Sequence, residues 1–246
     1  MKLKYGYLCS TLLLIAPVLS AQTFSGYTRS GDDLATITLN GTVYDAASLI
    51  NSTLTAVTDN NGGLLYNDTS APATPSSVMS DLSVTSGLLN INSATFTFDE
   101  PIVNGAGLDL FILDWGAFGG DTFEITINGA TLSNSEFGSY GSLYVPNSDI
   151  LDTTIFTSAG FSSVADMNAA LYTAGNISST YSGGWALDLS GFGVADGASI
   201  TSLTITDIGG ATIDPMMVMG IPEPGSYALL LGFALGAVCL GRRFLV

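Results

Sequence analysis

Leu108-Asp109-Leu110-Phe111-Ile112-Leu113-Asp114-Trp115 is the stretch of sequence that decides the fold class of this chain. In an extended strand, successive side chains point to opposite faces. Leu108, Leu110 and Ile112 then share one face, and Phe111, Leu113 and Trp115 share the other. A strand that is apolar on both faces is typical of a position covered by other layers on each side. The stretch therefore predicts a central, doubly covered strand.

Shorter alternating stretches lie on both sides of this strand, and each predicts a half-buried strand. They are Ile37 and Leu39 before Asn40-Gly41, Phe96 and Phe98 before Asp99-Glu100-Pro101, Phe123, Ile125 and Ile127 before Asn128-Gly129, the stretch 185–189, and Leu203 and Ile205. We expect a turn after each of the first three. The two Asn-Gly pairs favour type I′ hairpin turns, whose central residues both need a positive φ.

One segment has helical spacing, with Val164, Met167 and Leu171 on one face. Ser163 is placed to cap its start and Gly175 to end it, so we expect a short crossover helix. Residues 58–80 are rich in polar residues and Gly, and Pro72 and Pro75 predict a long surface loop outside the sheet. The predicted fold class is all-β: a single antiparallel β-sandwich, for which a jelly roll is one arrangement.

The two ends of the chain have a different composition from the part between them. Residues 1–21 run from Lys2 and Lys4 through an apolar segment to Ser20-Ala21, which is the layout of a secretory signal peptide. Residues 220–246 contain Pro222-Glu223-Pro224, an apolar run over 227–241 that predicts a short membrane-spanning helix, and Arg242-Arg243. Positive charge stays on the cytoplasmic side and would orient such a helix. Residues 22–219 form the predicted acidic sandwich.

This C-terminal arrangement closely resembles the PEP-CTERM sorting tail, over about residues 221 to 246. The resemblance implies recognition by an exosortase, a membrane transpeptidase or protease of Gram-negative bacteria that also produce exopolysaccharide. Pro222, Glu223, Pro224, Arg242 and Arg243 would then be a sorting motif read by a partner enzyme. The protein would be held transiently in the inner membrane by its tail and then delivered to the outer surface or extracellular matrix. Three apolar residues follow the arginines, whereas the family often ends on the basic residues themselves.

Composition limits the partners and the chemistry of the part between the ends. The whole chain has a net charge of −16, and Arg29 is the only basic side chain of residues 22–219. Such a surface repels nucleic acid and anionic membranes, so we expect contact with a membrane only through the tail. The chain has no His, and both Cys residues lie in its ends. Catalysis by Ser-His-Asp or Cys-His groups is therefore excluded.

Two sets of residues are candidate binding sites. The Gly-rich stretch 114–121 and the strand after Gly184 offer carboxylates and rings for a carbohydrate ligand, or alternatively only a turn and buried packing residues. These candidates are Asp114, Trp115, Phe118, Asp121 and Trp185. Calcium is the metal that an oxygen-only donor set favours. Its candidate ligand turns contain Asp32, Asp33, Asp59 and Asp196, although acidic loops are more often simply solvated.

The sequence therefore favours a non-enzymatic surface or matrix protein, structural or adhesive, associated with exopolysaccharide. Its expected processing partners are signal peptidase and an exosortase. A carbohydrate-binding module, with or without calcium, is the alternative. Glycoside hydrolysis by a pair of carboxylates also stays open, because it needs only two Asp or Glu groups at the right separation. We expect no catalytic residues and assign none.

Overall fold

We describe the fold from a computed structural model of the chain. It describes residues 24–31, 33–59, 64–67, 74–80, 82, 87–115, 122–137, 141–143, 154–175, 182–209 and 213–222. Strands dominate these residues and pair antiparallel in four sheets. The predicted all-β class is therefore confirmed.

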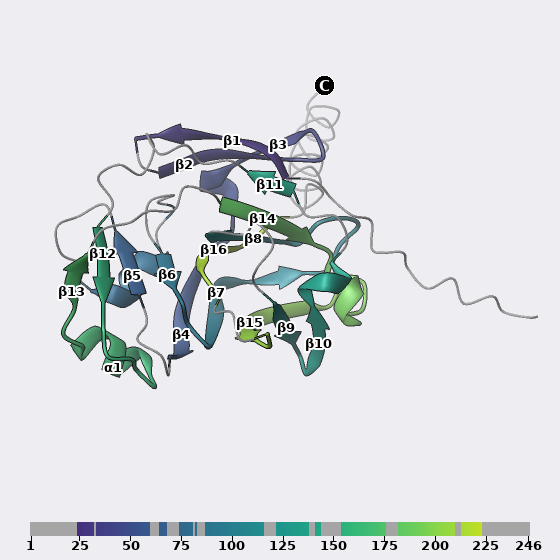
Figure 1. Cartoon of the computed structure of the whole chain (residues 1–246). Coiled ribbons are helices and arrows are strands. Elements are labelled where there is room, and N and C mark those ends of the chain that lie inside the picture. The colour runs from purple at the N-terminus through teal and green to yellow at the C-terminus, as the bar shows by residue number, and fades with distance from the viewer. Residues whose placement is uncertain are drawn as a thin grey trace, which may run out of the picture.

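Three of the sheets are stacked as layers (Figure 1). The five-stranded sheet has the order β10-β9-β15-β7-β4 and consists of β4 (Ser52–Thr58), β7 (Ser93–Val103), β9 (Phe123–Ile127), β10 (Ala130–Ser133) and β15 (Ser199–Asp207). The central sheet has the order β11-β14-β8-β16 and consists of β8 (Leu110–Trp115), β11 (Gly141–Leu143), β14 (Ser182–Leu187) and β16 (Pro215–Gly220). The three-stranded sheet consists of β1 (Phe24–Ser30), β2 (Asp33–Leu39) and β3 (Thr42–Asp45).

The fourth sheet lies beside these layers, next to the helix α1 (Val164–Ala169) (Figure 1). It has the order β13-β12-β5-β6 and consists of β5 (Leu64–Asn67), β6 (Gly87–Leu89), β12 (Thr154–Thr157) and β13 (Thr173–Gly175). Short 3₁₀ helices cover Ala46–Ser48, Pro75–Ser80, Asn134–Glu136 and Leu189–Phe192. The predicted sandwich corresponds to the five-stranded and central sheets, and the three-stranded sheet adds a layer that a single sandwich does not contain.

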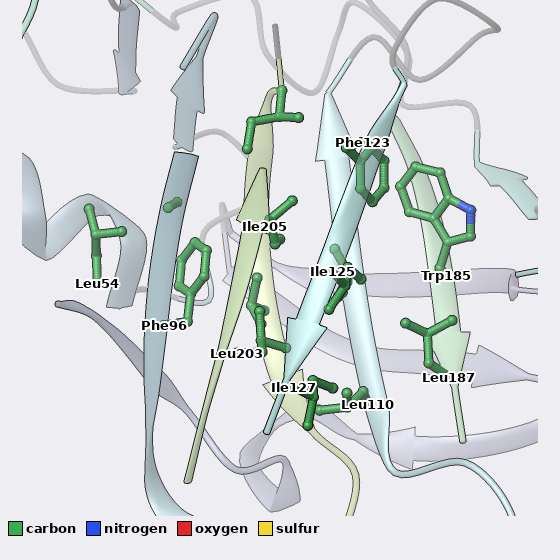
Figure 2. Packing of buried hydrophobic residues seen from close by; sticks show 14 of the residues in the cluster. Leu54, Phe96, Leu110, Phe123, Ile125, Ile127, Trp185, Leu187, Leu203 and Ile205 are labelled. Carbon is green, nitrogen blue, oxygen red and sulfur yellow. The ribbon is translucent and has the colours of Figure 1, made fainter. Parts of the chain in front are cut away.

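The central sheet separates two hydrophobic cores, and β8 contributes to both. Leu110 and Ile112 belong to the larger core, which fills the space against the five-stranded sheet. Figure 2 shows part of this core. Phe111 and Leu113 belong to the smaller core, against the three-stranded sheet. The doubly covered strand is therefore confirmed, but its alternation begins at Leu110, because Leu108 lies before the strand and packs on the smaller core.

Both Asn-Gly pairs form the predicted two-residue hairpin turns. Asn40 and Gly41 have φ of 49° and 79° and join β2 to β3. Asn128 and Gly129 have φ of 51° and 84° and join β9 to β10. A positive φ at both central residues matches the right-handed twist of the flanking strands, so the local sequence fixes the register of each hairpin.

The predicted helix begins as expected but ends early. The Ser163 side chain accepts a hydrogen bond from the Asp166 backbone N–H at 3.1 Å, and Met167 is fully buried. The helix ends at Ala169, Leu171 is 94% exposed, and Gly175 lies in β13. The helix joins the neighbouring antiparallel strands β12 and β13, so it does not cross from one sheet to another as predicted. The apolar spacing of Leu171 was coincidental.

Two other predictions about connections were wrong. The stretch Asp99-Glu100-Pro101, where a turn was expected, forms a bulge inside β7. Thr97 pairs with Ser202 of β15 and Ile102 pairs with Ile200, so β7 has more residues between these two pairs than β15 has. Proline is tolerated in a bulge because no ladder hydrogen bond is required of it there. The predicted loop over 58–80 contains β5, which pairs with β6 and β12. Pro75 starts a 3₁₀ helix, and Pro72 lies outside the described residues.

Candidate functional site

Asp114 stands near the end of β8, where strands on both sides hold it. It pairs with Gly183 of β14 and with Pro215 of β16. Its side chain is only 4% exposed, and Oδ1 accepts a hydrogen bond from the Asp214 N–H at 3.1 Å. The carboxylate therefore helps to fix the backbone that enters β16.

Asp214 continues this contact to the next part of the chain. Its Oδ1 accepts a hydrogen bond from the Asn90 N–H at 2.6 Å, and Asn90 has a φ of 57°. The charged acceptor thus supports a residue in the left-handed region that most side chains avoid. Sequence reasoning missed Asp214, although Asp directly before Pro is a common signal for a turn.

Of the other residues in the predicted carbohydrate site, some lie outside the described residues, and Trp185 is buried. Phe118, Asp121 and the side chain of Trp115 lie outside the described residues. Trp185 is 7% exposed, and its ring meets Phe123 edge to face at a centroid distance of 5.0 Å (Figure 2). Stacking on a sugar needs an exposed ring face, whereas Trp185 lies in the larger core, which is the packing alternative that the sequence also allowed.

The predicted calcium ligands are spread over different parts of the fold. Asp33 is exposed at the start of β2, Asp59 is buried after β4, and Asp196 is exposed in a turn before β15. Asp32 lies outside the described residues. The described ranges contain no group of three or more Asp, Glu, His or Cys residues that could hold a metal ion.

The contacts of Asp59 are with Phe161 and Tyr172 of the same chain. Its backbone forms two hydrogen bonds with Phe161, with N···O distances of 2.7 and 3.1 Å. Burial, and secondly the negative charge of Asp59, raises the pKa of Tyr172 to about 12. The neutral phenol donates a hydrogen bond to the Met167 carbonyl at 3.0 Å and so holds the end of α1.

Asp109 is the carboxylate most deeply placed in the fold, and sequence reasoning assigned it no role. It is fully buried; Oδ1 accepts from the Gly105 N–H at 3.1 Å and Oδ2 accepts from the Leu189 N–H at 2.8 Å. Its backbone also pairs with Leu187 and Ile221. The sequence signal for this role is the position of Asp109 between two leucines of an apolar stretch. A carboxylate in such a place is expected to be buried, and a buried charge needs hydrogen bonds to satisfy it.

The carboxylates of Asp109, Asp114 and Asp214 therefore act on backbone N–H groups, and known proteins offer no guide to a further role. No protein-family model, curated protein or solved structure matches this chain. Of the predicted sorting motif, Pro222 is described, whereas Glu223, Pro224, Arg242 and Arg243 lie outside the described residues. In the part of the chain that the structure describes, no helix is long and apolar enough to cross a membrane.

A second candidate surface, which sequence reasoning missed, is the outer face of the five-stranded sheet. Its middle row crosses β7, β15, β9 and β10 through the paired residues Thr95, Thr204, Thr126 and Thr131. The Oγ1 atoms of Thr95 and Thr204 are 2.9 Å apart, as are those of Thr126 and Thr131. The row is therefore a continuous line of threonines joined in hydrogen-bonded pairs.

Similar rows lie on either side of this line. One consists of Ser93, Thr206, Glu124 and Ser133, and the other of Thr53, Thr97 and Ser202. Thr55, at a bulge in β4, bonds through Oγ1 to Thr97 Oγ1 at 3.1 Å. We call these three rows with Thr55 the hydroxyl face. Glu124 is its one charged member. The sequence signal for this face is the run of Ser and Thr residues that alternate with the apolar residues of each strand.

Proposed function

We propose that this chain is an exported protein of the cell surface or extracellular matrix, sorted by an exosortase and structural or adhesive in role. One observation carries the proposal: Pro222-Glu223-Pro224, the apolar run 227–241 and Arg242-Arg243 follow each other in the order of a PEP-CTERM tail. The signal-peptide layout of residues 1–21 supports the same destination.

The position of the motif relative to the fold is compatible with recognition by a processing enzyme. β16 ends at Gly220, and the Ile221 N–H donates to the Asp109 carbonyl at 2.7 Å. Pro222 follows directly and is half-buried. A protease or transpeptidase that acts near Pro222–Pro224 would therefore act at the border of the folded layers without having to cut within a strand.

The test is delivery of the full chain in a Gram-negative host with and without an exosortase. The variant P222A/E223A/P224A is expected to stay in the inner-membrane fraction, whereas the natural chain reaches the outside with its tail processed. A matched control carries P146A and E100A, which change the same residue types elsewhere, and is expected to behave as the natural chain does. Surface delivery that persists in the motif variant, or in the host without exosortase, would refute the proposal.

A carbohydrate-binding module is the second candidate, and the hydroxyl face favours it. The candidate residues Asp114, Trp115, Phe118 and Asp121 of the Gly-rich stretch would provide further contacts, with calcium as an optional ligand. Removal of calcium by a chelator should then lower the melting temperature, because a ligand that binds the folded state stabilises it. Catalysis by a carboxylate pair is the weakest proposal. It would be eliminated if hydrolysis of a polysaccharide stayed at full rate when each carboxylate was replaced in turn.

A further inference from the structure

We propose that the hydroxyl face of the five-stranded sheet is a contact surface for an uncharged polysaccharide. The proposal deepens the function proposed above, on which it rests for the place where the chain would meet such a polymer. It goes beyond the candidate residues Asp114 and Trp115, because these belong to β8 of the central sheet, whereas the hydroxyl face lies on the outer side of the five-stranded sheet and uses different residues.

Charge is the first argument for an uncharged partner. The chain carries a net charge of −16, so an anionic polymer is repelled at long range. A cationic partner would be attracted to carboxylates, but the rows of the hydroxyl face contain only Glu124. Arg29, the basic residue of the acidic part, lies in β1 of the three-stranded sheet. Glu136 borders the face, where its Oε2 accepts from the Ser133 N–H at 2.7 Å. The hydroxyl face therefore carries little charge for so acidic a protein, and a neutral chain can approach it without electrostatic repulsion.

The hydrogen-bonding capacity of the face is the second argument. A threonine hydroxyl has one donor proton and two acceptor lone pairs. In the pairs Thr95–Thr204 and Thr126–Thr131, one proton of each pair is used between the partners. Each pair keeps its other proton and most of its lone pairs, so the face offers more acceptors than donors. A polysaccharide hydroxyl also has one proton and two lone pairs, and because it rotates freely it can donate to the lone pairs of this face or accept its remaining protons.

Geometry is the third argument. Neighbouring strands are about 4.8 Å apart, so a row across four strands presents hydroxyls over roughly 14 Å. Threonine is stiff at χ1, and Thr95, Thr126 and Thr204 are half-buried by their neighbours. Little side-chain entropy is lost when such preorganised groups bind a ligand. The face can thus contact several successive sugar units of an extended chain.

A second copy of the protein fits this face less well than a polysaccharide does. Two hydroxyl faces brought together would belong to two strongly negative molecules, which repel each other at long range, whereas a neutral polysaccharide meets no such repulsion. The net charge therefore disfavours self-association. This contrast makes the two occupants separable by experiment.

The experiment measures binding of the full chain, purified in mild detergent, to three uncharged polysaccharides (dextran, agarose and cellulose) and to anionic alginate. The test variant is T95V/T126V/T204V, which removes hydroxyls from three neighbouring strands while keeping side-chain shape and strand propensity. The matched control is T28V/T36V/T38V on the three-stranded sheet, where Thr28 and Thr36 form a similar pair at 2.7 Å. Circular dichroism and melting temperature establish that both variants fold.

We expect the natural chain to bind at least one uncharged polysaccharide and not alginate. The test variant should bind it roughly tenfold more weakly, the loss expected from about two net hydrogen bonds, and the control should bind unchanged. Absence of binding to all three uncharged polymers, equal binding to alginate, or equal loss in both variants would overturn the inference. A change of oligomeric state in the test variant alone, measured by light scattering, would overturn it in favour of a second copy. Because binding is measured on purified chain, failure of sorting and failure of binding are distinguishable.

Discussion

Replacing Asp109 by alanine should destabilise the fold more than replacing an exposed carboxylate with a similar backbone contact. The substitution leaves the Gly105 and Leu189 N–H groups without the acceptors that now lie 3.1 and 2.8 Å away. A hydrogen bond to a charged group contributes about 1.5–3 kcal/mol, and a buried N–H left unpaired costs a similar amount. Asp109→Ala should therefore lower the free energy of unfolding by about 3–5 kcal/mol. Asp109→Asn keeps one acceptor oxygen and should cost roughly half as much.

The assay is urea denaturation followed by circular dichroism, with the slope against urea compared among variants. The matched control is Asp207→Ala, because Asp207 Oδ1 accepts from the Gly209 N–H at 2.9 Å in an exposed position. This control should cost less than about 1 kcal/mol. Equal losses for the Asp109 and Asp207 variants would refute the claim that the buried carboxylate stabilises the fold through the Gly105 and Leu189 N–H groups.

Further predictions concern two glycines and the Tyr172 phenol. Gly220→Ala should lower the free energy of unfolding by about 1–3 kcal/mol, because the new Cβ would lie 2.5 Å from the Ile102 Cδ1. Adding Ile102→Val removes that Cδ1 atom and should restore part of the lost stability. Gly129→Ala should cost about 1–2 kcal/mol, because its φ is 84° in the β9–β10 turn, and an unchanged melting temperature would contradict this. Tyr172 should titrate near pH 12 in ultraviolet absorbance, so its contribution to stability is complete below about pH 10 and lost as the pH rises toward about 12. Asp59→Asn should lower the pKa of Tyr172.

Features fixed by neighbouring residues were predictable from the sequence. The Asn-Gly turns depend on two residues whose φ values the local chemistry determines, and the helix start depends on Ser163 and the N–H three residues later. The doubly apolar strand β8 was predictable for the same reason, because strand geometry alone assigns its side chains to two faces.

Features that depend on distant pairing were not predictable. β5 forms because β6 and β12 border it, although its own surroundings are rich in loop residues. The bulge at Pro101 requires β15 on its other side to continue the ladder. The side chain of Trp185 follows two glycines and could have been exposed or buried. Its strand pairs with β8 at Ile112, which places the ring in the core. The hydroxyl face needs the alignment of five strands, which no single alternating segment specifies.

The partners of β8 also determine the order in which the protein can fold. This strand ends at Trp115, but it pairs only with β14 and β16 on the central sheet, which end at Leu187 and Gly220. A chain that emerges from the ribosome N-terminus first must therefore keep this strongly apolar segment without a strand partner on the central sheet until β14 has followed, and with one side still unpaired until β16 has followed. High contact order of this kind slows folding and leaves the apolar segment open to aggregation before its partners are available.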